Sequence, residues 1–89
     1  MKAVITVTGK DTVGIIADVS AVCAKRGANI CEITQSVLSE YFAMIMIAEL
    51  EGLTVPFADF ADELAALGKS KRLDIHTMHE DIFNTMHHI

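Results

Sequence analysis

The 89-residue sequence predicts an α+β fold in which two helices cover one face of an antiparallel four-stranded sheet. Three observations support this prediction. Four short segments have the alternation or the apolar composition of β-strands. Two longer segments repeat their apolar residues at the helical period. Glycine and proline separate these segments, which gives the element order βαββαβ with a short helix after it.

The first two elements are a strand and a helix. Residues 2–8 are predicted to form the strand, because apolar side chains alternate there with mainly polar ones. Residues 12–26 are predicted to form the helix, whose apolar stripe runs from Ile15 to Cys23. Gly27 suits the residue that follows a helix C-terminus. This helix is therefore well delimited in the sequence.

The second predicted strand, residues 29–38, is irregular. No single period of two holds along it, since Ile30 and Ile33 cannot share one face of a regular strand. An extra residue in one strand of an antiparallel pair restores such a pattern. We therefore predict a β-bulge near Cys31 or Glu32.

A turn at residues 39–40 leads into the third predicted strand, residues 41–50. Both faces of this strand are apolar, as expected of a central strand that is covered on both sides. A two-layer sandwich covers only one of the two faces. We therefore expect a further element or a second subunit to cover the other face.

The remaining elements are a helix, a strand and a short helix. Residues 54–67 are predicted to form the second helix, with Pro56 in its first turn and Gly68 at its end. The last strand is predicted over residues 71–78. Residues 80–89 form a helix too short to be stable alone in water, so it must dock on another surface.

Two right-handed crossovers joined by a hairpin give a sheet of order 4-1-3-2 with both main helices on one side. This arrangement is the ferredoxin-like sandwich. We expect one domain over residues 1–79. The helical extension over residues 80–89 is expected to pack on this domain or on its dimer partner.

Composition limits the possible partners. Apolar residues make up 52% of the chain, more than one small core can hide, which favours association with a second copy. The net charge of −5 makes nucleic acid an unexpected partner. No apolar run has the length of a membrane span and no signal peptide opens the chain, so no membrane partner is expected. The cytoplasm is the expected compartment.

The cysteines and histidines do not predict catalysis, a resident metal or a cofactor. Cys23 and Cys31 lack a redox spacing, and both are expected to be buried apolar residues with a disfavoured thiolate. The four histidines lie near the end of the chain without a standard metal-ligand spacing. They are expected on the surface, with adventitious divalent-metal binding as the alternative. They are His76, His79, His87 and His88.

The segment between the first strand and the first helix is the best candidate for a binding site. Asp11 is an N-cap candidate, and the absence of a Cβ at Gly14 lets a carboxylate or another anion approach the amides of the first helical turn. In the alternative, Gly9 and Gly14 only form a turn and a close helix–sheet contact. Asn29 is also ambiguous, because its amide can bind a ligand or stabilise a turn.

Residues 4–17, VITVTGKDTVGIIA, followed by residues 27–30, GANI, resemble an ACT domain. The hairpin residues 35–38 and 44–46 and the tail 79–89 are similar to those of the small free-standing ACT proteins of bacteria and archaea, an uncharacterised, UPF0237-like group. The resemblance covers essentially the whole chain.

The resemblance implies a regulatory ligand-binding module and not an enzyme. ACT domains generally pair, and in many of them an amino acid or a similar metabolite binds at the domain interface. The ligand is held by the loop after the first strand and by the second strand of a neighbouring domain. The site residues implied here are Asp11, Thr12, Val13, Gly14, Ile15, Asn29 and Ile30.

The expected partners are a second copy of the chain, a small metabolite and an unidentified regulated protein. The alternative function is a constitutive protein–protein interaction or adaptor subunit without a small ligand. A third class, metal binding through the terminal histidines, predicts that a chelator lowers the melting temperature.

Overall fold

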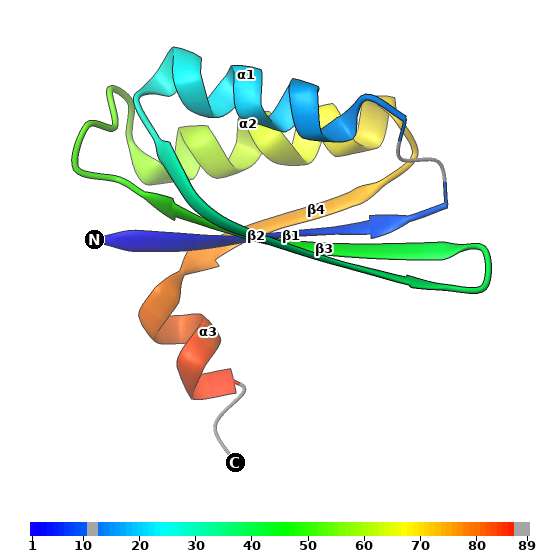
Figure 1. Cartoon of the computed structure of the whole chain (residues 1–89). Coiled ribbons are helices and arrows are strands. Elements are labelled where there is room, and N and C mark those ends of the chain that lie inside the picture. The colour runs from blue at the N-terminus through cyan, green and yellow to red at the C-terminus, as the bar shows by residue number, and fades with distance from the viewer. Residues whose placement is uncertain (11–12, 87–89) are drawn as a thin grey trace.

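The computed structural model describes residues 1–10 and 13–86. The strands form one antiparallel sheet of order β2-β3-β1-β4, so the predicted ferredoxin-like topology is confirmed. Helices α1 and α2 cover one face of the sheet, and α3 lies on the other side (Figure 1). The elements in chain order are β1 (Lys2–Gly9), α1 (Ile15–Arg26), β2 (Asn29–Leu38), β3 (Tyr41–Glu49), α2 (Phe57–Ser70), β4 (Asp74–His79) and α3 (Glu80–Met86).

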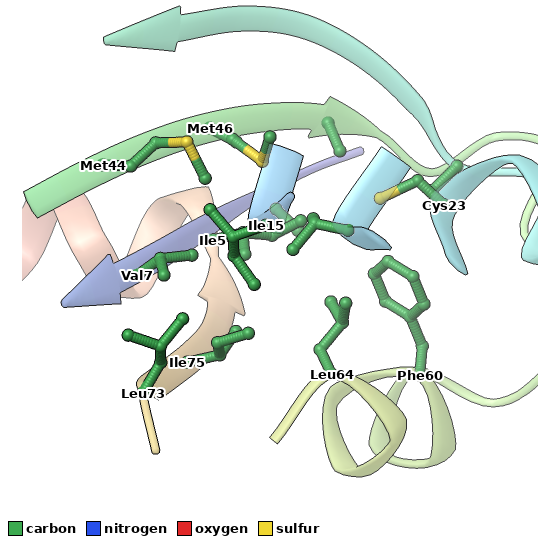
Figure 2. Close-up of a cluster of buried hydrophobic side chains, with 14 of the residues drawn as sticks. Ile5, Val7, Ile15, Cys23, Met44, Met46, Phe60, Leu64, Leu73 and Ile75 are labelled. Carbon is green, nitrogen blue, oxygen red and sulfur yellow. The ribbon is translucent and has the colours of Figure 1, made fainter. Parts of the chain in front are cut away.

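The core fills the space between the sheet and the two main helices (Figure 2). We call this side of the sheet the helix face and the opposite side the open face. Fully burying one large apolar side chain contributes about 1.5–3 kcal/mol, so this layer supplies most of the driving force for folding. Its largest fully buried side chains are Ile5, Val7, Ile15, Val19, Cys23, Met44, Met46, Phe60 and Leu64.

Helix α1 begins later than predicted. Its N-cap is Gly14, which adopts a left-handed conformation with φ of 77°, and its first residue is Ile15. The predicted start at residue 12 is therefore wrong, and the prediction for Asp11 lies outside the described residues, as does Thr12. A left-handed backbone costs glycine little, because glycine has no Cβ. At the other end, the predicted role of Gly27 as the C-terminal cap is confirmed.

Helix α2 also differs from its prediction at both ends. Pro56 is the N-cap of α2 and not a member of its first turn. The helix continues to Ser70, beyond the end predicted at Gly68. Gly68 is buried against the backbone of Leu73 and the side chain of Ile75, so it serves a close helix–strand approach inside the last turn.

Strand β2 lies at an edge of the sheet. Its predicted bulge is confirmed by a shift in the pairing with β3 between Ile30 and Glu32. The prediction that Cys31 is buried is wrong, because its side chain is exposed on this edge strand, which has a neighbouring strand on one side only. Cys23 is buried, as predicted.

The open face is covered at one end. Helix α3 contacts β1 and β4, and Val4, which points away from the main core, is buried there. Towards the turn between β2 and β3 the cover ends. Tyr41 and Ile45 are 54% and 39% exposed. The apolar face predicted for the third strand is thus present and only partly covered within the chain.

Candidate functional site

The two glycines at the ends of the β1–α1 connection have different surroundings. A Cβ at Gly9 would clash with the side chain of Leu73, so Gly9 permits a close contact inside the domain. A Cβ at Gly14 would meet no described atom within 4 Å. Gly9 thus fits the close contact of the structural interpretation, and the left-handed backbone of Gly14 fits its turn. Among the residues that the structure describes, none fills the space beside Gly14 at the start of α1.

The first turn of α1 has the features of an anion-binding helix start. The N–H of Asp18 donates to the carbonyl oxygen of Gly14 at 3.0 Å, which is the first hydrogen bond of the helix. The N–H groups before it have no acceptor within a helix, and Gly14 has no side chain that could cap them. The positive end of the helix dipole adds to this preference for negative charge. A carboxylate is a suitable group for this position.

The neighbours of Gly14 divide between surface and core. Val13 is 87% exposed, and Ile16 is exposed one turn further along the same end of the helix. The side chain of Ile15 is buried among the core residues, so only its backbone faces the site (Figure 2). The predicted residues Asp11 and Thr12 lie outside the described part of the chain.

Asn29 and Ile30 lie at the opposite end of the sheet from Gly14. Asn29 pairs with Glu49, which in turn pairs with Lys2 at the start of β1, whereas α1 begins beyond the end of β1. β1 has eight residues, so these ends are about 24 Å apart at ~3.4 Å per residue. Asn29 is exposed and Ile30 packs at the border of the core. Within one chain the predicted site residues therefore form two separate half-sites.

An exposed apolar surface accompanies the edge strand β2. Ile33 pairs with Met46 and Val37 with Phe42, so both point to the helix face, yet both side chains are exposed. Sequence reasoning did not assign these residues to the site. The signal that could have found them is the predicted position of β2 at a sheet edge, where apolar side chains lack a neighbouring strand.

Among the described residues, the buried thiol is not activated and metal ligands do not cluster. Burial raises the pKa of the Cys23 thiol to about 11, so the reactive thiolate is disfavoured. In the described part of the chain, no three His, Cys, Asp or Glu side chains gather as metal ligands. The ring of His79 stacks on Phe57 with centroids 4.0 Å apart. His87 and His88 lie outside the described residues.

Two ion pairs lie near the end of the sheet where β1 ends. Lys10, directly after β1, lies 3.4 Å from a carboxylate oxygen of Glu40 and 5.3 Å from the ring centroid of Tyr41. Lys71 lies 2.7 Å from a carboxylate oxygen of Asp18.

Among the described residues no helix has the length and apolar character needed to cross a membrane.

Comparison with protein families gives a match over nearly the whole chain. The model of the ACT domain matches residues 2–80. A UPF0237 protein of Clostridium acetobutylicum is 45% identical over 89 residues, which are 100% of both chains. A UPF0237 protein of Listeria monocytogenes is 41% identical over 87 residues, 98% of each chain. One from Methanocaldococcus jannaschii is 39% identical over 88 residues, 99% of this chain and 98% of the relative.

Solved structures give the same result. An ACT domain protein from Streptococcus pneumoniae superposes with a TM-score of 0.80 at 40% identity, over 93% of both chains. A formyltetrahydrofolate deformylase from Pseudomonas syringae superposes with a TM-score of 0.76 at 21% identity, over 88% of this chain and 27% of that chain, a likeness of fold alone. The predicted resemblance is thereby confirmed. The chain belongs to the ACT domain superfamily and, within it, to the UPF0237 proteins.

Proposed function

We propose that this protein is a cytoplasmic regulatory homodimer that binds an amino acid at the subunit interface. The ACT domain is a regulatory ligand-binding module. The observation on which the proposal depends most is the left-handed Gly14 before α1, where a Cβ would meet no described atom within 4 Å, because this space at a helix start suits a ligand. In this proposal residues 1–79 form the regulatory domain and residues 80–89 an extension of it.

Pairing of β2 from two copies would join the two half-sites. A twofold axis perpendicular to the sheet beside Ile33 pairs the two edge strands in antiparallel fashion. This pairing places Asn29 of the partner subunit near Val37. Val37 pairs with Phe42, and Phe42 pairs with Gly9, so Val37 and Gly9 lie at the same end of the sheet. The start of α1 in one protomer then lies beside the start of β2 in the other.

The combined site suits an amino acid. The amides of Ile15 and the residues after it face a carboxylate at the positive end of α1. The carboxamide oxygen of Asn29 of the partner subunit can accept a hydrogen bond from the ligand's amino group. The exposed side chains of Val13 and Ile16 offer an apolar surface to the ligand's side chain. The ligand would favour one dimer geometry by its differential affinity, typically ~1–3 kcal/mol.

A thermal-shift screen with the amino acids tests the proposal. A ligand present at 100 times its dissociation constant adds about 2.7 kcal/mol to the stability of the folded state. Asn29→Ala should abolish the shift produced by the active amino acid. Asn84→Ala replaces an equally exposed asparagine on α3 and should leave the shift unchanged. Equal shifts in both variants would contradict the assignment of Asn29.

The alternative function is a ligand-free adaptor that acts only through protein–protein contacts with a regulated protein. The exposed apolar residues Ile33 and Val37 support it equally well, since they fit any partner that pairs with β2. The same screen separates the two functions. A dimer that is stabilised by no amino acid would favour the adaptor.

A further inference from the structure

The open face of the sheet has a projecting helix at one end and a hollow at the other. Helix α3 leads away from the sheet at the end where β1 begins (Figure 1). Near the β2–β3 turn, at the other end, lies a hollow of about 310 Å³. Its lining comes from three adjacent strands, namely Thr8, Gly9, Ser36, Tyr41, Phe42 and Ala43.

Helix α3 projects an apolar side chain that its own domain does not cover. Ile82 is 52% exposed, although α3 contacts β1 and β4. The seven residues of α3 correspond to a length of about 10 Å at ~1.5 Å per residue. A helix this short gains its stability from packing, so an exposed isoleucine on it favours a further contact.

The middle of the open face, on β1 and β3, carries no charged side chain, whereas Glu32 on β2 and Asp74 on β4 lie at its edges. It consists mainly of apolar and hydroxyl side chains, among them Thr6, Thr34 and Ile45. At the rim of the hollow, Lys10 and Glu40 form an ion pair, and Asp74 lies beside Thr8 on β4. The chain carries a net charge of −5, so two copies repel one another over most of their surface. This repulsion is weakest over the uncharged middle of the open face.

We propose that a second copy of this chain covers the open face, with each α3 seated against the hollow of the other copy. A twofold axis that lies between the two facing sheets, oblique to the strands, exchanges the two ends of the face and creates both contacts at once. The acidic first turn of α3, Glu80 and Asp81, then approaches Lys10 of the partner subunit. This interface is separate from the β2 edge, and it neither needs nor excludes pairing there.

The size of the face agrees with this occupant. Four strands at ~4.8 Å spacing and up to eight residues at ~3.3 Å give the whole open face a footprint of about 500 Å², of which the chain's own α3 covers one end. The two α3 contacts add to this area. A standard interface buries about 800 Å² on each partner, so the face and the two helices together reach a comparable size.

Substitutions of two isoleucines of nearly equal exposure distinguish a failure of this inference from a failure of the proposed function. Ile45 is 39% exposed on the open face, and Ile33 is 41% exposed on the helix face beside the β2 edge. In sedimentation velocity, Ile45→Glu should lose the association through the open face. In the thermal-shift screen, it should keep its response to amino acids. Ile33→Glu should keep the open-face association and lose the ligand response. If Ile45→Glu sediments like the unaltered protein, the inference is overturned, whatever Ile33→Glu does.

Cross-linking between different copies provides a test that does not depend on the folding of Ile45→Glu. One protein carries Ser36→Cys in the hollow and the other carries Ile82→Cys on α3, both with Cys31→Ser. After mixing, a short bismaleimide should join them at least tenfold faster than a control pair in which Ala65→Cys, on exposed α2, replaces Ser36→Cys. Equal rates in the two pairs would overturn the inference.

Discussion

Two neighbouring residues of β3, Met46 and Ile45, represent the two faces of the sheet. Met46 points to the helix face and is completely buried, whereas Ile45 points to the open face and is 39% exposed. The two side chains are similar in size and both are apolar, so β3 has apolar side chains suited to burial on both faces. The fold buries the side chains that β3 turns to the helix face, and it covers the open face only at the end where α3 lies. The part of an apolar face that the chain leaves exposed therefore indicates an interface with another molecule.

The largest expected difference between the faces is in stability. Met46→Ala should lower the free energy of unfolding by ~2–5 kcal/mol, because it leaves a cavity in the core. Ile45→Ala removes a half-exposed side chain and should cost less than about 1 kcal/mol in dilute solution. Urea unfolding at low protein concentration measures both values. Equal losses would mean that the two faces are covered alike within one chain.

The two cysteines extend the comparison to the edge strand. Cys23 is buried on the helix face and its pKa is raised from 9.0 to about 11, whereas Cys31 is exposed on β2. The higher pKa alone reduces the thiolate fraction about 100-fold. Iodoacetamide at pH 7.5, followed by mass spectrometry, should label Cys31 first and Cys23 only on unfolding. Labelling of both at one rate would contradict the burial of Cys23.

The smallest expected effect belongs to an ion pair between the two main helices. The Arg26 guanidinium, 2.7 Å from Glu63, lowers the pKa of that carboxyl from 4.5. A lowered pKa means that the unfolded chain binds the proton more readily, so the stabilisation is complete above pH 4.5 and is lost as the pH falls through the folded-state pKa. Glu63→Gln should therefore have a slightly lower melting temperature than the unaltered protein at pH 7, and the difference should shrink below pH 4.5. A difference that is independent of pH would contradict this role.

The fold was predictable because each element has its own local pattern. The bulge in β2 followed from the incompatible positions of Ile30 and Ile33. The start of α1 was not predictable from capping preferences, because these favour Ser, Thr, Asp or Asn at the N-cap, and the N-cap of α1 is the left-handed Gly14. The exposure of Cys31 was missed because burial was assigned from residue type, although the predicted strand order already put β2 at an edge.

The candidate site was predictable only in part. Gly14 and Asn29 could be named from the resemblance, but their separation at opposite ends of the sheet depends on strand direction and register. The hollow on the open face was not predicted at all. It is formed by Thr8, Ser36 and Ala43 from three strands, and their meeting requires the pairing of both β2 and β1 with β3.

Mixing two defective variants tests the central claim, a ligand site shared between two subunits. In the Gly14→Val homodimer and the Asn29→Ala homodimer, every site lacks one of its two halves. A mixed dimer contains one site with both halves intact, formed by Gly14 of one subunit and Asn29 of the other. Random mixing makes half of the dimers mixed, and one of their two sites is intact, so about a quarter of the sites should bind.

Isothermal titration of the equimolar mixture with the active amino acid is the direct measurement. Our account predicts that each variant alone binds nothing and that the mixture recovers about a quarter of the stoichiometry of the unaltered protein. A mixture that binds no more ligand than the two separate variants would contradict a site shared between subunits.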